Sequence, residues 1–252
     1  MKKLTYGLLL ALAAIVVLAG CGVLQEPTEA SGTIEAIPLE TQSAGVMNEA
    51  TVAVDPTAEV DVATEAPAEA RLSEPVVFSI DSAASEVRFQ LDEDLRGEHK
   101  TVVGATDQVA GQLSINLADL SQTQVGIIQI NARTLATDNN FRNRAIQNEI
   151  LDTGDYEFIT FTPMSIEGLP AAAAVGEAIT FSLIGDLTIR AMTLPVTFTV
   201  EATAVSETQI TGTAAAVVNR ADFGLQIPSV PSVANVEEEV ELYIDFTANA
   251  SS

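Results

Sequence analysis

The sequence predicts an all-β fold: an antiparallel closed β-barrel of about eight strands with one short inserted helix, preceded by a signal peptide and a linker. Apolar and polar residues alternate along many segments between residues 86 and 246, and a period of two is typical of half-buried strands. Two segments, Ile179 to Ile189 and Leu194 to Val205, are each about eleven residues long. Long strands in meander order favour a closed barrel over a small sandwich, because closure removes the exposed edges that promote aggregation.

The first 21 residues are typical of an export signal. Lys2 and Lys3 precede an apolar run from Leu4 to Leu18, which is shorter than the ~20 residues needed to span a bilayer. The run ends in Leu18-Ala19-Gly20-Cys21, which resembles a bacterial lipobox and contains the only cysteine. The resemblance implies that Cys21 receives a diacylglycerol and becomes the mature N-terminus. The alternative is a plain signal peptide with an incidental cysteine.

Residues 22–74 are expected to form a disordered acidic linker. They contain eleven acidic residues, one base (Arg71) and no aromatic residue. Such a composition buries too little apolar surface to offset the loss of chain entropy. A free coil of 53 residues has a root-mean-square span of roughly 40 Å, so the linker is predicted to hold the following domain off the membrane.

Residues 75–252 form the predicted barrel domain. It contains 24 acidic and 8 basic residues, and this excess argues against nucleic acid as a partner, because phosphate recognition needs basic patches. With Cys21 as the only cysteine, no intrachain disulfide can form. The core must therefore be stabilised by packing alone, for which about 178 residues suffice.

The alternating strands define one apolar face, which we expect to point into the barrel and to contact an apolar ligand. An eight-stranded barrel can enclose one small ligand, although the same residues could instead touch one another and fill the interior. The predicted ligand-facing residues are Val87, Phe89, Leu91, Leu113, Ile115, Ile128, Ile130, Ile159, Phe161, Phe181, Leu183, Leu187, Phe198, Leu242, Ile244 and Phe246.

One segment departs from the period of two. From Asp138 to Ile150, apolar residues including Phe141, Ile146 and Ile150 recur at helical spacing. The segment is predicted to be a single helix inserted between strands, covering one mouth of the barrel.

Several short motifs, taken in their order and spacing, are similar to those of the YceI-like family of exported, lipocalin-like barrels. The motifs are Phe78-Ser79-Ile80-Asp81, Ser85-Glu86-Val87-Arg88-Phe89, Val109-Ala110-Gly111-Gln112-Leu113, Gly185-Asp186-Leu187-Thr188-Ile189 and Asn219-Arg220-Ala221-Asp222-Phe223-Gly224-Leu225. The resemblance implies a barrel whose interior binds a polyisoprenoid-type chain, without catalysis. Related domains often pair, so both a monomer and a homodimer stay open.

This chain lacks two histidines that many members of the family carry. Ala145 and the pair Arg190-Ala191 stand at those positions, so no headgroup or metal contact can be transferred to them. Arg190 and Arg220 are the candidate headgroup contacts. The ordinary alternatives are an exposed turn residue paired with an acid for Arg190, and a loop support for Arg220.

Nothing in the sequence indicates an enzyme or a cofactor. His99 is the only histidine and lies in a charged stretch, and no Gly-x-Ser-x-Gly, His-Glu-x-x-His or phosphate-binding glycine loop is present. Asp92, Glu93 and Asp94 could bind calcium weakly, but a solvated acidic turn is the simpler interpretation. Two functions stay open: a membrane-anchored lipid-binding protein, and a non-catalytic scaffold or adhesion lipoprotein with a packed barrel and protein-binding loops.

Overall fold

The computed structural model describes residues 25–39 and 74–251. The predicted signal peptide with Cys21 and most of the predicted linker lie outside these residues. The main strands are β1 (Val76–Ile80), β2 (Glu86–Leu95), β3 (Glu98–Thr106), β7 (Ile128–Asn131), β8 (Phe158–Glu167), β9 (Ala178–Ile189), β10 (Met192–Ser206), β11 (Gln209–Asn219) and β13 (Glu239–Ala250). The short strands are β4 (Val109–Ala110), β5 (Gln112–Ile115), β6 (Gln124–Val125) and β12 (Val233–Ala234). Among the described residues, no helix is both long and apolar enough to cross a membrane.

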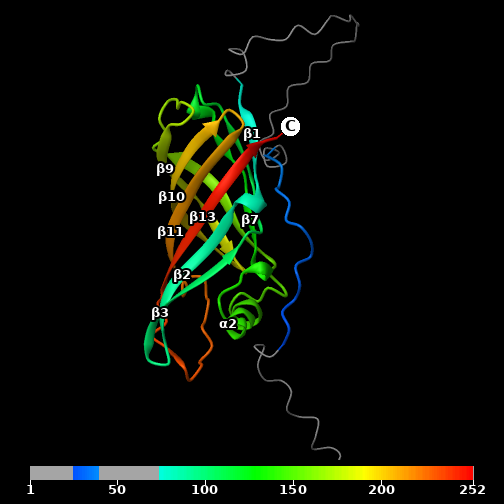
Figure 1. Ribbon diagram of the computed structural model, residues 1–252, viewed down its shortest axis with the longest axis vertical. Coiled ribbons are helices and arrows are strands. Elements are labelled where there is room, and N and C mark those ends of the chain that lie inside the picture. Colours follow the sequence, from blue (N-terminus) through cyan, green and yellow to red (C-terminus); the bar gives the residue numbers. More distant parts are fainter. Residues whose placement is uncertain (1–24, 40–73, 252) are drawn as a thin grey trace, which may run out of the picture.

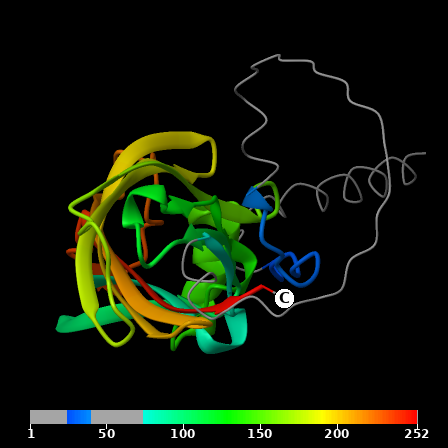
Figure 2. The same ribbon diagram turned by 90° about the horizontal axis from the view of Figure 1, so that it is seen from above.

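The strands form one antiparallel sheet that curls on itself (Figures 1 and 2). The order along the sheet is β4-β7-β8-β9-β10-β11-β13-β1-β5-β6. β5 pairs with β1 and β4 pairs with β7, and only Gly111 separates β4 from β5. These two short strands therefore bring the ends of the order together, so the all-β antiparallel prediction is confirmed.

β13 pairs with two different strands along one of its edges. Glu241 to Asp245 of β13 pair with β2, whereas Ala248 to Ala250 pair with β1. β2 continues the sheet to β3, and a single bridge from Ala105 to Ala136 leads towards the helical segment. The molecule thus has an end formed by β2, β3 and the helix, and a far end where β1 and β5 pair (Figure 1).

The inserted helix is present where it was expected. α2 (Asn140–Ala145) passes directly into a π-helical turn, η7 (Ile146–Ile150). The Asn139 side chain caps the start by accepting hydrogen bonds from the backbone N–H groups of Phe141 and Arg142, which satisfies two otherwise unpaired donors. The helix lies at the β2–β3 end of the barrel (Figure 1).

Inside the barrel, aromatic rings occupy the space left by glycines on neighbouring strands. Phe89 lies directly opposite Gly104, and a Cβ built on Gly104 would come within 2.2 Å of the Phe89 ring. Phe246 lies opposite Gly212 in the same way, with a corresponding distance of 2.7 Å. Because glycine has no side chain, these rings can pack against the wall of the barrel.

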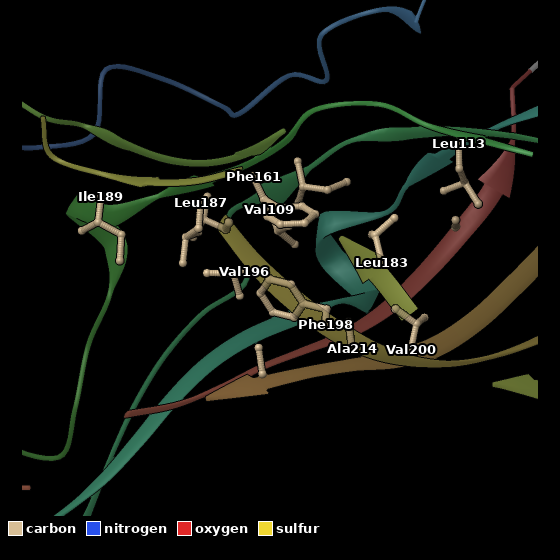
Figure 3. Packing of buried hydrophobic residues seen from close by; sticks show 14 of the residues in the cluster. Val109, Leu113, Phe161, Leu183, Leu187, Ile189, Val196, Phe198, Val200 and Ala214 are labelled. Atoms are coloured by element: carbon tan, nitrogen blue, oxygen red, sulfur yellow. The ribbon is translucent and has the colours of Figure 1, made fainter. Parts of the chain in front are cut away.

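The middle of the core is held by an aromatic pair. Phe161 of β8 and Phe198 of β10 are both buried and meet edge to face, with ring centroids 5.0 Å apart (Figure 3). This arrangement is favourable for aromatic rings, whose edges and faces carry opposite partial charge. Leu183 and Leu187 of β9 belong to the same buried cluster.

Residues 25–39, which we call the N-terminal strap, lie along the outside of the barrel (Figure 1, blue). The Asn148 side chain donates a hydrogen bond to the Gln25 carbonyl at its start, and the Leu39 N–H donates to Gln112 at its end. Between them, Ile34 is only 8% exposed. Polar contacts and one buried side chain therefore join the strap to the barrel, although it lies within the predicted disordered linker, residues 22–74. Residues 40–73 are outside the described part.

Candidate functional site

The main feature of the interior is a cavity of about 550 Å³ at the β2–β3 end of the barrel. Volumes of this order are typical of sites for small ligands. Ten residues predicted to face a ligand line it: Val87, Phe89, Leu91, Ile130, Ile159, Phe161, Leu187, Phe198, Leu242 and Ile244.

A second, smaller cavity of about 110 Å³ continues towards the far end. The other six predicted residues line it: Leu113, Ile115, Ile128, Phe181, Leu183 and Phe246. Phe161, Phe198 and Ile244 line both cavities, so the aromatic pair divides one long interior into two chambers. All sixteen side chains therefore border the interior space, while their contact with a ligand stays a prediction.

The larger cavity opens between α2, the β2–β3 hairpin and the loop that follows β11. Phe141 of α2 is 66% exposed and Val230 of the loop is 42% exposed, yet both line the cavity. Residues that meet both solvent and the cavity mark its mouth. The helix, predicted to cover one mouth of the barrel, borders the mouth, and its Arg142, Ala145 and Ile146 also line the cavity.

An ion pair between Arg142 and Glu93 lies at this mouth. Their side chains are 15% and 7% exposed, and Arg142 Nη2 is 2.7 Å from Glu93 Oε1. Arg142 Nη1 is also 2.7 Å from Asp138 Oδ1. The expectation of a solvated acidic turn is wrong for Glu93, which belongs to β2 and points inward in phase with Leu91 and Leu95.

A second polar cluster surrounds Arg88, which alternates on β2 with the inward-facing Val87 and Phe89. Its guanidinium carbon is 5.3 Å from the centre of the Tyr243 ring, and its Nη2 donates to Asp245. Burial alone would raise the pKa of Asp245, but the hydrogen bonds from Thr213 and Arg88 outweigh it and hold that pKa below its usual range. A hydrogen bond to Glu241 raises the pKa of the Tyr243 hydroxyl.

The two candidate headgroup residues occupy different places. Arg220 lines the cavity, but its guanidinium donates to the carbonyls of Glu237 and Leu225 and to the Glu238 carboxylate. These bonds correspond to the loop-supporting alternative. Arg190 is not among the lining residues; it lies over the Tyr156 ring at 5.8 Å and donates to the Ile150 carbonyl.

His99 and the neighbouring acids do not form a metal site in the described part of the chain. His99 is 69% exposed on β3, and its ring nitrogens are 3.4 Å and 3.9 Å from carboxylate oxygens of Asp92 and Asp94. No group of three or more histidine, cysteine or acidic residues that could hold a metal ion occurs among the described residues.

Sequence reasoning missed the loop at the mouth. The stretch from Leu225 to Val236 contains no charged residue, and its Ile227, Pro228 and Val230 line the cavity. It has no strand period, so the alternation that identified the barrel wall could not mark it. The feature that could have identified this loop is its lack of charge, since the chain contains 46 charged residues.

An antiparallel barrel around an apolar cavity defines the lipocalin-like class of small β-barrels. Residues 78–248 match the YceI-like domain. The chain therefore belongs to the YceI-like family, and the resemblance seen in the sequence motifs is confirmed.

Two solved structures share this fold. A polyisoprenoid-binding domain from Saccharophagus degradans is 17% identical, with a TM-score of 0.56 over 70% of this chain and 99% of that domain. BcnA from Burkholderia cenocepacia is 20% identical, with a TM-score of 0.53 over 68% of this chain and 99% of BcnA. Among curated proteins no match was found.

Proposed function

We propose that this protein is a membrane-anchored, extracytoplasmic lipid-binding protein that holds or transports a polyisoprenoid-type chain inside its barrel. One observation carries the proposal: sixteen inward-facing apolar side chains line an interior of two adjoining chambers rather than filling it. Transfer of apolar surface from water into such a space is favourable by about 25 cal/mol per Å².

The shape of the interior favours a long, flexible chain over a compact ligand. The two chambers follow the barrel axis and meet at Phe161 and Phe198. A branched aliphatic chain can pass an aromatic constriction and contact both chambers. The polyisoprenoid-binding domain named above has the same fold, which supports this ligand class.

The mouth favours a neutral polar headgroup, such as a hydroxyl or a quinone, over a phosphate. Arg142 and Arg220 are already paired with carboxylates, and Glu93 adds negative charge to the lining. Arg96 also lines the mouth, and the described carboxylates lie beyond ion-pairing distance of it. A single exposed arginine offers weak attraction for a dianion.

We propose no catalytic role. Apart from Arg96, the charged residues that line the cavity are engaged in ion pairs. No nucleophile with an adjacent base occurs along the described lining. The scaffold alternative assumed a packed barrel, whereas the interior contains a cavity of about 550 Å³. Lipid binding is therefore the function that the geometry supports best.

The proposed location depends on the N-terminal segment. Cleavage before Cys21 and addition of a diacylglycerol would leave residues 22–74 between the anchor and the barrel. The protein would then work at the outer face of the cell membrane or in the periplasm, where it could exchange a lipid with the bilayer.

The test is extraction of protein purified from membranes. Organic solvent should release about one isoprenoid chain per protein, identified by mass spectrometry. Val102→Asp and Val103→Asp provide matched variants, because Val102 lines the cavity and is 3% exposed, whereas Val103 is 41% exposed on the same strand. Only Val102→Asp should lose the lipid while folded, as checked by circular dichroism. Equal retention by both variants, or protein that is always empty, would contradict the proposal.

A further inference from the structure

The N-terminal strap begins at the mouth of the cavity. The Asn148 side chain donates a 2.9 Å hydrogen bond to the Gln25 carbonyl, and Arg144 pairs with Glu26. Arg144 and Asn148 belong to α2 and η7, the segment that also supplies Phe141 and Arg142 to the cavity lining. The first residues of the strap are therefore bound to the helical segment α2–η7, which forms part of the rim of the cavity mouth.

From the rim, the strap continues towards the far end of the barrel. The Glu29 carbonyl accepts a hydrogen bond from Arg133, and Ser31 donates two hydrogen bonds to Glu157. Burial of Ile34 follows, before Leu39 contacts Gln112. The contacts follow one direction along the barrel wall (Figure 1), so the docked strap has a fixed polarity relative to the mouth.

This polarity determines how far the mouth can be from the proposed anchor. Cys21 precedes Gln25 by four residues, which span at most about 14 Å when fully extended. A free tether of 53 residues would instead allow roughly 40 Å and any orientation of the barrel. Docking of the strap therefore shortens the free chain between the anchor and the barrel, and this short chain is attached beside the mouth.

The rim is suited to contact with a lipid bilayer. Phe141 and Val230 are exposed beside the cavity, and aromatic and aliphatic side chains are favourable at the membrane interface. The acidic run from Glu237 to Glu239 lies next to this loop, so attraction to anionic headgroups does not drive the contact. The matching surface is a zwitterionic phospholipid bilayer.

We propose that the N-terminal strap orients the barrel, holding the mouth of the cavity against the bilayer so that a lipid passes directly between the membrane and the interior. This inference rests on the proposed lipid anchor at Cys21. It adds that the segment after the anchor, residues 25–39, is a positioning element for the barrel.

The absence of tryptophan from the chain makes the orientation measurable. Phe141→Trp places a single reporter at the rim, and Val175→Trp places one in the exposed loop between β8 and β9, beside the smaller chamber at the far end. Each lipidated protein, purified from membranes, is reconstituted on phosphatidylcholine vesicles with brominated acyl chains. Phe141→Trp should lose most of its emission, whereas Val175→Trp should keep it.

A pair of strap variants in the Phe141→Trp background tests the cause. Ile34→Asp removes the buried contact, and Thr33→Asp adds the same charge at an exposed neighbour. Ile34→Asp should restore the emission to the level of Val175→Trp, and Thr33→Asp should leave it quenched. Glu26→Lys, which sets two cations against each other at Arg144, should act like Ile34→Asp without altering a buried site.

Vesicle flotation separates the failures. Protein that floats with the vesicles but shows equal quenching at both reporters, or quenching that survives both Ile34→Asp and Glu26→Lys, would overturn the orienting role and leave the anchor and lipid binding intact. Protein that does not float would overturn the anchor, and with it this inference.

Discussion

Replacing Gly104 by alanine should reduce the space for a ligand without unfolding the barrel. The new Cβ would lie 2.2 Å and 2.4 Å from two atoms of the Phe89 ring, whereas carbon atoms in contact are normally about 3.5–4.0 Å apart. The ring must therefore move by more than about 1 Å. Since Phe89 lines the larger cavity, it has empty space on its far side into which it can move.

The magnitudes of the two effects should differ. Overpacking usually destabilises a core by about 1–3 kcal/mol, and relief into the cavity places Gly104→Ala at the lower end. If the displaced ring excludes two or three methylene groups of a ligand, at about 0.8 kcal/mol each, the affinity falls by about 2 kcal/mol, or roughly 30-fold. Chemical denaturation measures the first effect, and titration with a fluorescent isoprenoid analogue measures the second.

Two controls make the result specific. In Gly212→Ala the Cβ would lie 2.5 Å from the backbone oxygen of Glu201, which cannot move aside, so this variant should lose much more stability. In the double variant Phe89→Leu/Gly104→Ala the smaller side chain should restore binding. Unchanged affinity of Gly104→Ala, or no recovery in the double variant, would refute the idea that glycine opposite Phe89 keeps the cavity open.

Three further changes have defined outcomes. Phe161→Ala should join the two chambers and lengthen the bound chain found by mass spectrometry, at a cost of about 3–5 kcal/mol in unfolding free energy; an unchanged chain length would contradict this. Arg142→Gln should cost about 3–5 kcal/mol by leaving Glu93 buried without its cation, and adding Glu93→Gln should recover part of the loss in a double-mutant cycle. Burial alone would raise the pKa of Glu157, but hydrogen bonds from Ser31 and Asn131, together with the Arg133 charge, hold that pKa below its usual 4.5. The ionised Glu157 therefore stabilises the folded state above pH 4.5, and this contribution is lost as the pH falls through the lowered pKa. Thermal unfolding of Glu157→Gln should therefore depend less on pH in this acidic range than that of the unchanged protein, and parallel curves would disprove the assignment.

The inner face of the barrel could be predicted because strand periodicity fixes which side chains share a face. All sixteen residues chosen by this phase line at least one of the two chambers. The same phase also pointed to Glu93, which lies two residues after Leu91 and two before Leu95. Together with its neighbours Asp92 and Asp94, Glu93 forms a run of three acids, which we interpreted as a solvated turn. The strand period, had it been applied to this run, would have placed Glu93 on the inner face.

Whether the barrel is hollow could not be predicted, because it depends on strand register. Phe89 finds space beside the wall only because β3 places Gly104 directly opposite it. The docked strap was hidden for a related reason. Its composition is that of a disordered linker, and it is held by a few specific contacts, such as Ser31 with Glu157, that average composition does not reveal.

The size of the cavity implies that the protein is most stable when the interior is occupied. Space inside a protein core costs stability in proportion to its volume, and this cavity has a volume of about 550 Å³. Glycine opposite aromatic rings lowers this cost by packing the wall itself, but the lining side chains still lack partners across the space. A bound chain supplies those partners, so removing lipid by mild extraction should lower the melting temperature, and adding back an isoprenoid should raise it in a concentration-dependent way. Identical melting of extracted and untreated protein, with lipid release verified by mass spectrometry, would mean that the wall alone supports the cavity and that the ligand contributes nothing to the fold.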